Sequence, residues 1–272
     1  MSLESGKFTV LHLSDVHATT GELLYGQVDT LARLDQVASY ALSAGITPEA
    51  ILVTGDLIQR GHEGAYPAVN AALERLGARL GAPVLTVLGN HDVPASATCL
   101  TGHGAGHTRV VHIGPVRFLL LDTSSGYLDQ AGLDLLTTEL AEPYGIGSVV
   151  ALHHAPIPSP LPTLSKTGLK NPEALAAAIV GGDVRTMLAG HYHHPMTGTF
   201  SGVPVHVGPS LAYHQVMNAG PHTVSGHDLA MFSLVHITDA GVSSAPVSLS
   251  AANPLFSSPA PASTAVPSAL PV

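Results

Sequence analysis

Short apolar runs recur along the chain, and each is bounded by Gly, Asp or Asn. A run of this length between turn-forming residues is typical of a strand buried on both faces of its sheet. The strands predicted in this way cover residues 8–13, 51–54, 84–88, 118–121, 149–152 and 186–188.

Between several of these runs, the apolar residues return with the period of a helix. One such segment covers residues 28–42 and another covers residues 64–80. In the first segment a single stripe collects Leu31, Leu34, Val37, Tyr40 and Ala41. Such a stripe is typical of a helix that packs on a core. The alternation of strand, helix and strand predicts an α/β layer fold.

The spacing of polar residues after the strands supports this fold. Asp15 and Asp56 lie 41 positions apart, and Asp56 and Asn90 lie 34 apart. Each step fits one strand–helix–strand unit of about 30 residues or more. Ligands of open α/β sheets bind outside the carboxyl ends of the strands. We therefore expect these polar residues to converge on one edge.

The C-terminal third has a different pattern. Residues 203–207 and 229–237 alternate in polarity and predict further strands, which we expect to close a second sheet. From residue 247 onward, Pro, Ala and Ser dominate. We therefore divide the chain into one domain, residues 1–246, and a tail, residues 247–272, that is mobile or loosely packed.

Composition and charge narrow the classes of partner. The chain has 272 residues and a formal net charge of −9, so a phosphate backbone is repelled and general nucleic-acid binding is not expected. Cys99 is the single cysteine, which excludes a disulfide within the chain. The sequence has no signal-peptide pattern and no apolar run of about 18 residues. These features predict a cytoplasmic protein without a transmembrane segment.

Five polar segments carry the candidate chemistry, at residues 14–17, 55–56, 89–92, 153–154 and 190–193. They offer carboxylate, carboxamide and imidazole ligands but no sulfur, a set that suits Mn, Fe, Co or Zn. On an extended backbone, the Asp-x-His and His-x-His spacings place both side chains on one side. Glycines before Asp56, Asn90 and His191 permit a close backbone approach.

In this order, the five segments resemble the signature of the calcineurin-like metallophosphoesterase superfamily: Asp-x-His, Gly-Asp, Gly-Asn-His-Asp, His and Gly-His-x-His. Within the superfamily the chain is most similar to bacterial class III 3′,5′-cyclic nucleotide phosphodiesterases, through residues 24–29, 55–61, 152–158 and 188–191. The resemblance covers about residues 8–240. It implies a four-layer α-β-β-α metallophosphoesterase sandwich, in which helices flank two mixed sheets.

The resemblance also implies a centre of two divalent or mixed-valence metal ions, with Fe and Mn favoured and Zn or Co as alternatives. Seven side chains would hold them: Asp15, His17 and His193 on one ion, Asn90, His153 and His191 on the other, and Asp56 between the two. His91 would be the general acid, and Asp92 would orient it. The phosphate of the substrate would contact His17, Asn90, His91 and His193.

The implied reaction is hydrolysis of cAMP or cGMP to the 5′-nucleotide by a metal-bridging hydroxide. Two alternatives stay open. The substrate is another small phosphodiester, such as a 2′,3′-cyclic nucleotide or a glycerophosphodiester, or the fold is a catalytically silent scaffold. From residue 186 onward the only charged residues are Asp228 and Asp239, which also suggests a homodimer interface.

Several polar residues have a structural explanation beside the functional one. His154 is either a hydrogen-bonded structural residue or a substrate contact. Tyr213 and His214 either pack a loop or line a pocket for a base or ribose. Arg60 is either solvated or a phosphate donor, and we expect His12, in the middle of an apolar run, to be a buried structural histidine.

Overall fold

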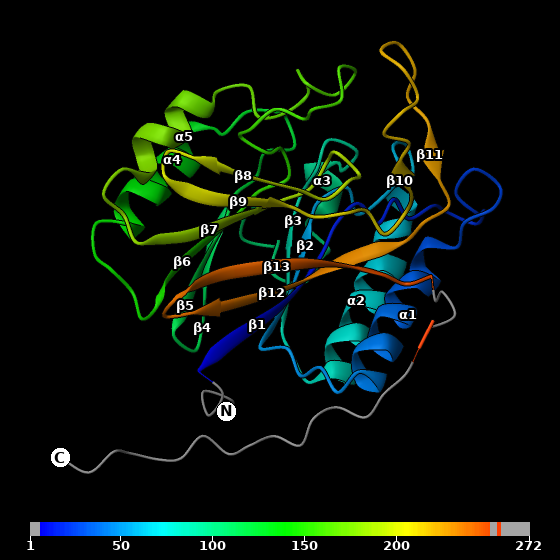
Figure 1. Cartoon of the computed structure of the whole chain (residues 1–272), viewed down its shortest axis with the longest axis horizontal. Coiled ribbons are helices and arrows are strands. Elements are labelled where there is room, and N and C mark those ends of the chain that lie inside the picture. The colour runs from blue at the N-terminus through cyan, green and yellow to red at the C-terminus, as the bar shows by residue number, and fades with distance from the viewer. Residues whose placement is uncertain (1–5, 251–254, 257–272) are drawn as a thin grey trace.

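Two β-sheets packed face to face form the centre of the protein, and helices cover the outer side of each sheet (Figure 1). The computed structural model describes residues 6–250, 255 and 256. In spatial order, the first sheet consists of β13 (Gly241–Ser248), β12 (Met231–Thr238), β1 (Lys7–Leu13), β2 (Ala50–Thr54) and β3 (Val84–Val87). The second consists of β4 (Arg109–Ile113), β5 (Val116–Leu120), β6 (Gly147–Ala151), β7 (Val184–Ala189), β9 (Val203–Val207) and β8 (Met196–Phe200).

Both sheets are mixed. In the first sheet, β1, β2 and β3 are parallel, and β12 pairs antiparallel with β1. In the second sheet, β5, β6, β7 and β9 are parallel, and β4 and β8 are antiparallel edge strands. A short hairpin of β10 (His214–Gln215) and β11 (Gly226–His227) stands outside the sheets. The predicted sandwich of two mixed sheets flanked by helices is confirmed.

Four of the helices form the two outer layers. The helices of the described residues are α1 (Thr30–Ser43), the short 3-10 helix η2 (Glu63–Ala65), α2 (Tyr66–Leu80), the short α3 (Pro94–Ala97), α4 (Gln130–Glu139) and α5 (Pro172–Ile179). In Figure 1, α1 and α2 lie on the outer side of one sheet, and α4 and α5 lie on the outer side of the other. No helix of the described residues is long and apolar enough to cross a membrane.

Successive apolar side chains of a strand point to opposite faces of its sheet and so fill three apolar layers, one between the sheets and one under each layer of helices. On β1, Phe8 and Val10 point between the two sheets, whereas Leu11 and Leu13 point toward α1 and α2. On β5, Phe118 faces the layer between the sheets. Because successive strand side chains point to opposite faces, a strand covered on both sides is apolar throughout. This explains why the central strands appear in the sequence as continuous apolar runs.

Helix α1 shows how the local sequence sets an element. Asp29 caps its N-terminus by accepting a hydrogen bond from the backbone N–H of Ala32 at 3.0 Å. Of the predicted stripe, Leu34, Val37 and Ala41 are buried. Tyr40, which the stripe predicts to face the core, is 39% exposed, so that part of the prediction is wrong. Its ring nevertheless contacts that of Phe232.

The C-terminal predictions were right about the strands and wrong about part of their placement. Residues 203–207 form β9 of the second sheet, whereas residues 231–238 form β12 of the first. Strand β13 extends to Ser248, so its last two residues lie in the predicted tail, and Leu249 packs on the core beneath α1 and α2. Most of the predicted tail lies outside the described residues.

Candidate metal centre

The polar segments that follow the central strands meet at the carboxyl ends of both sheets. Asp15 follows β1, Asp56 follows β2 and Asn90 follows β3, all in the first sheet. The second sheet supplies His153 after β6 and His191 after β7. Side chains from the two sheets contact one another, with Nε2 of His153 lying 3.2 Å from Oδ1 of Asn90 and 3.4 Å from Oδ2 of Asp56. The predicted convergence at one edge is therefore confirmed.

One group of ligand atoms consists of Asp15, His17, Asp56 and His193, all of them buried. The Nε2 atom of His193 lies 3.2 Å from Oδ1 of Asp15 and 3.1 Å from Nε2 of His17. A divalent ion with ligands at about 2.1 Å sets neighbouring ligand atoms about 3.0–3.4 Å apart. The two contacts of His193 have this spacing, and the ligand atoms of all four side chains lie within 4.8 Å of one another.

A second group forms around His153. Its Nε2 atom lies 3.2 Å from Oδ1 of Asn90 and 3.3 Å from Nδ1 of His191. Oδ2 of Asp56 lies 3.4 Å from this nitrogen and 3.6 Å from Nε2 of His17 in the first group. Asp56 thus stands between the two groups, the position that a carboxylate shared by two ions needs.

The backbone at these residues is unusual. Five of them adopt left-handed conformations, with φ between 49° and 75°: Asp15, His17, Asp56, His191 and His193. Each such non-glycine residue costs about 1–3 kcal/mol, and such strain clusters at functional sites. The expected extended backbone is therefore wrong, because β1 ends at Leu13 and β7 ends at Ala189. Asp15 and His17 still meet, with 4.0 Å between Oδ1 and Nε2, whereas His191 and His193 belong to different groups of ligands.

Two glycines allow the turns to approach one another. A Cβ atom on Gly190 would lie 1.9 Å from Oγ of Ser14 and 2.7 Å from the carbonyl oxygen of Thr54. A Cβ atom on Gly55, which has a φ of +84°, would lie 2.5 Å from Nδ1 of His153. Side chains at these positions would push the ligand turns apart, as the sequence predicted for the glycines that precede ligands.

Unsatisfied polar atoms indicate what the residues could hold. Within the described part of the chain, Oδ1 of Asp15 and Nε2 of His191 are buried without a hydrogen-bond partner. The contact of His193 with Asp15 is close, but its geometry is not that of a hydrogen bond. Oxygen and nitrogen atoms that face one another without protons between them suit a divalent cation. The side chains therefore fit divalent metal ions.

Protonation in the metal-free protein is consistent with this fit. Burial lowers the pKa of His17 to about 4 and that of His191 to about 3, so both rings are neutral at pH 7 and their nitrogens are free to bind a metal. Burial also disfavours the charged form of His153, but the charge of Asp56 and a hydrogen bond to it raise that pKa to about 9. A metal ion that binds to His153 must therefore displace a proton.

Gln59 is a site residue that the sequence analysis missed. Its Oε1 atom accepts hydrogen bonds from Nδ1 of His17 at 2.9 Å and from Nδ1 of His91 at 3.0 Å. One amide oxygen thus fixes two rings with their Nε2 atoms directed elsewhere. The available signal was its place within residues 55–61, a segment that was noted only for its resemblance.

The expected task of Asp92 needs correction. Its carboxylate accepts hydrogen bonds from the N–H groups of Gly89 and Leu57, at 2.8 and 3.1 Å, and from the hydroxyl of Tyr66 at 3.2 Å. Because the carboxylate is occupied by these donors, it anchors the turn that carries Asn90 and His91. The ring of His91 is positioned by Gln59 instead, and its backbone N–H donates to Asp56 at 2.7 Å.

The structure also places three other polar residues that the sequence left with more than one explanation or assigned to the core: His154, Arg60 and His12. His154 is buried, its Nδ1 lies 3.3 Å from Oγ1 of Thr123, and its ring centroid lies 4.6 Å from that of His191. His154 therefore has a structural partner, and one of its ring nitrogens also lies within 4.8 Å of ligand atoms of His153 and His191, so it could take part in holding a metal ion. Arg60 is exposed at the rim, and its guanidinium donates to the carbonyl oxygen of Asn90 at 3.3 Å. Nε2 of the buried His12 lies 2.8 Å from Oγ1 of Thr54.

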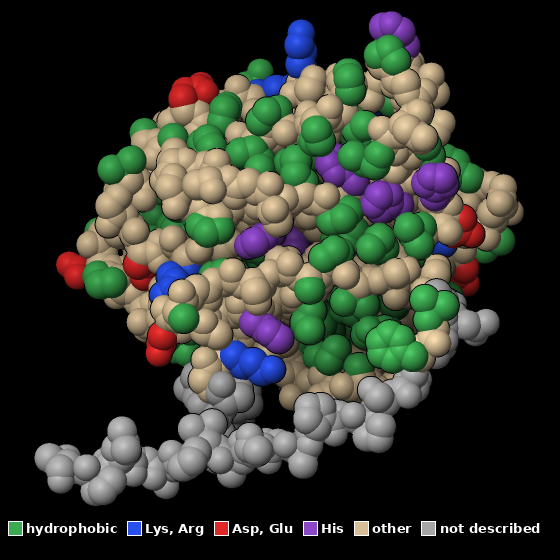
Figure 2. Space-filling model, in the orientation of Figure 1, with side chains coloured by type: hydrophobic (Ala, Val, Ile, Leu, Met, Phe, Trp, Pro, Cys, Tyr) green, Lys and Arg blue, Asp and Glu red, His purple; other side chains and the backbone are tan. Residues whose placement is uncertain are grey.

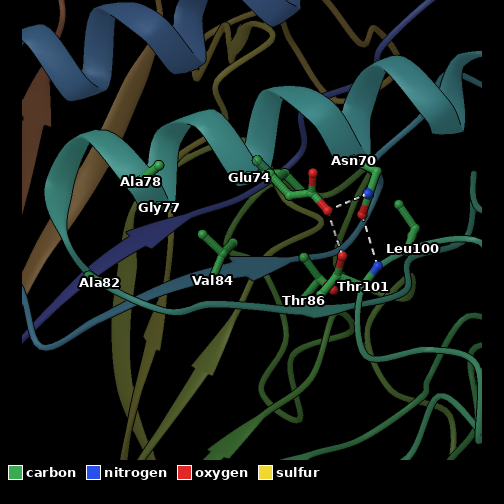
Figure 3. A pocket seen from close by; sticks show the side chains of 10 residues that line it. Asn70, Glu74, Gly77, Ala78, Ala82, Val84, Thr86, Leu100 and Thr101 are labelled. Carbon is green, nitrogen blue, oxygen red and sulfur yellow. Dashed lines mark hydrogen bonds between the residues drawn. The ribbon is translucent and has the colours of Figure 1, made fainter.

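A hollow of about 250 Å³ lies elsewhere, between α2 and the edge strand β3 (Figure 3). Its polar groups bind one another: Glu74 accepts from Asn70 at 2.9 Å and from the hydroxyl of Thr101 at 3.0 Å. Much of the remaining wall is apolar and includes Val84 and Leu100. None of the metal-binding candidates lines this hollow, so it takes no part in the chemistry described above.

Comparison with known proteins gives one family and one fold. The family model described as calcineurin-like phosphoesterase matches residues 8–195. A Rhodococcus erythropolis protein named "Probable cyclic nucleotide phosphodiesterase" is 36% identical over 86% of this chain and 81% of its own length. A cAMP/cGMP dual specificity phosphodiesterase of Mycobacterium tuberculosis is 36% identical over 85% of this chain and 76% of its own. A dimetal phosphatase from Danio rerio shares the fold, with a TM-score of 0.54 and 14% identity over 87% of this chain and 98% of its own.

Proposed function

Because the chain belongs to the calcineurin-like phosphoesterase family, we propose that it hydrolyses 3′,5′-cyclic nucleotides such as cAMP and cGMP to 5′-nucleotides. One observation carries the proposal. Seven buried or half-buried oxygen and nitrogen ligands form two groups, and Asp56 stands between them. Relatives named as cyclic nucleotide phosphodiesterases, each matched over more than three quarters of its length, support the choice of substrate.

Two divalent ions would be held at this centre. We assign Asp15, His17 and His193 to one ion, Asn90, His153 and His191 to the other, and Asp56 to both. When bound, the ions would lower the pKa of a water molecule and offset negative charge on the phosphate. Iron and manganese, with zinc and cobalt as alternatives, all suit this set of ligands.

His91 would serve the leaving group. Its Nδ1 atom is held by Gln59, so a proton for the 3′ oxygen of the ribose would sit on Nε2. Burial lowers the pKa of this ring, and the charge of Asp56 opposes that effect. The negative phosphate of a bound substrate would favour the protonated ring further. We assign His91 as the general acid and Gln59 as the residue that positions it.

A comparison of substrates tests the proposal. Initial rates are measured on 3′,5′-cyclic AMP, 2′,3′-cyclic AMP and glycerophosphocholine, with the purified protein loaded with manganese or iron. We expect the first substrate to have the highest kcat/KM. Absence of turnover of 3′,5′-cyclic AMP, with turnover of another diester, would replace the proposed substrate. Absence of turnover of all three would favour the silent scaffold.

Two variants separate the assigned roles. Asp56→Ala should abolish hydrolysis and weaken both ions, because its carboxylate lies between the two groups. His91→Ala should lower kcat while two equivalents of metal stay bound, as measured by elemental analysis. His236→Ala is the control, since His236 lies on β12, outside both groups of ligands. Loss of an ion from the His91 variant would show that its role is misassigned.

A further inference from the structure

A hollow of about 390 Å³ lies beside the metal-binding groups, and Tyr213, which lines the hollow, contacts His193 of the first group. On one side, the ring centroid of Tyr213 lies 4.2 Å from that of His193, and its carbonyl oxygen lies 3.1 Å from Nδ1 of the same histidine. On the other side, the ring of Tyr25 contacts it edge to face at 5.7 Å. The hollow therefore lies next to His193, with Tyr213 between them.

Tyr213 is held firmly in this position. A Cβ atom on Gly226 would lie 2.6 Å from Cδ2 of Tyr213, so the backbone of the β10–β11 hairpin rests directly on the ring. The ring centroid of Tyr213 also lies 6.0 Å from that of His17, a second candidate ligand of the same group.

Tyr25 is displayed at the mouth of the hollow at an energetic cost. It is 65% exposed and adopts a φ of +53°, a conformation that an aromatic residue rarely takes. A tight hairpin turn closed by the pairing of Leu24 with Val28 presents it. Packing does not explain a large ring left mostly in solvent on a strained backbone. A ligand that stacks on the ring would explain it.

The chemistry of the lining restricts what that ligand is. Val28 and Val224 add apolar surface, and Gln27 adds an amide that both donates and accepts. The carboxylate of Asp228 is paired with the guanidinium of Arg33. The lining therefore offers aromatic faces and hydrogen-bonding groups, and its acidic group is already neutralised. A flat, uncharged heteroaromatic ring fits these properties.

We propose that this hollow binds the base of the nucleotide substrate, with Tyr25 stacked on the base and Tyr213 flanking the ribose between base and phosphate. The inference rests on the proposed function, because it places the phosphate at the metal-binding groups. Tyr25 is then a residue that determines specificity for nucleotides over other diesters. Figure 2 shows several histidine and apolar side chains, and few Lys, Arg, Asp or Glu, on the face around β10 and β11.

The experiment compares ligands with and without a base. Competitive inhibition constants for 5′-AMP and ribose 5-phosphate are measured on the metal-loaded protein, together with kcat and KM for 3′,5′-cyclic AMP. Saturation-transfer NMR with adenosine on the metal-free protein reports contact with the base without turnover. The variants are Tyr25→Ala, Tyr25→Phe, which keeps the stacking ring, and Tyr40→Ala, which removes a half-exposed tyrosine on α1 that contacts Phe232.

We expect Tyr25→Ala to raise KM for 3′,5′-cyclic AMP and the inhibition constant of 5′-AMP by about tenfold, the size of one stacking contact. The inhibition constant of ribose 5-phosphate and kcat should not change. Tyr25→Phe and Tyr40→Ala should stay within about twofold of the wild type.

Two results would overturn the inference: 5′-AMP that binds the wild type no better than ribose 5-phosphate, or an unchanged KM in Tyr25→Ala. If the wild type hydrolyses other diesters but no cyclic nucleotide, the proposed function fails. In that case, transfer of saturation to the adenine protons that is lost in Tyr25→Ala supports the base site, and absence of transfer in the wild type rejects it.

Discussion

Gly190 is the position at which one methyl group should do most damage to the centre. An alanine Cβ there would lie 1.9 Å from Oγ of Ser14, 2.7 Å from the carbonyl oxygen of Thr54 and 3.0 Å from Oδ2 of Asp15. An ordinary contact between carbon and oxygen is longer than about 3.3 Å. The hydroxyl of Ser14 would have to move by more than 1 Å, by rotation or together with its turn. The backbone oxygen of Thr54 cannot rotate away, so the turn after β7 or the end of β2 must move as well.

The expected losses follow from that displacement. Overpacking of this kind typically costs about 1–3 kcal/mol of stability. A displacement of about 1 Å at a reacting centre costs on the order of 10²-fold in rate. Gly190→Ala should therefore remain folded, with kcat/KM lowered about 10²-fold and metal affinity reduced. The measurements are urea unfolding, kcat/KM at saturating manganese, and metal titration.

Two further variants test whether the loss of activity comes from the clash at Gly190. Ser14→Ala combined with Gly190→Ala removes the closest clash but leaves Thr54, so it should recover activity only in part. Gly104→Ala is the matched control, because a Cβ atom there meets nothing within 4 Å and the backbone is not left-handed. Activity of Gly190→Ala within threefold of the wild type would refute the view that these two turns clamp the ligands.

Three other outcomes are expected. Burial lowers the pKa of His12 to about 3, from about 6.5 in the unfolded chain. The unfolded chain therefore binds a proton at His12 as the pH falls below 6.5, which should lower the free energy of unfolding by about 2 kcal/mol between pH 7 and pH 5. Urea unfolding of the metal-free protein should show this dependence on pH in the wild type but less of it in His12→Gln, and an equal dependence in both would contradict the assignment. Gln59→Leu should weaken metal binding about 10–100-fold, because Nδ1 of His17 and of His91 lose their acceptor, whereas Gln59→Glu should retain most of the affinity; calorimetric titration decides between these outcomes. Manganese at about 100 times its Kd should stabilise the metal-free protein by about 2.7 kcal/mol, visible as a higher Tm, and an unchanged Tm would argue against binding at the buried groups.

The sequence was sufficient for the layers of the fold and for the residues that gather at its edge. Strands such as β2 and β6 are covered on both sides, so their apolar runs are continuous and easily recognised. Edge strands such as β4 and β8 are partly exposed and carry no such run, and they were missed. The position of β12 in the first sheet depends on pairing with β1, a contact between the two ends of the domain that local pattern does not encode.

The site was predicted by residue but not by conformation. Resemblance named Asp56 and the six other candidate ligands, and the structure brings all of them together. The resemblance could not reveal that the backbone of five of these ligands is left-handed, because this strain is imposed by the packing of the turns against one another. Gln59 and Tyr25 were missed for a similar reason, since their roles depend on neighbours far away in the sequence. The homodimer stays a prediction.

The pairing of β1 with β12 has a consequence for synthesis in the cell. Thr238 lies opposite Lys7, so the first sheet is finished only when nearly the whole domain has emerged from the ribosome. His191 and His193 emerge late as well, long after Asp15. A nascent chain therefore presents the acidic half of the centre without its partners, and tight capture of metal must wait until translation is almost complete.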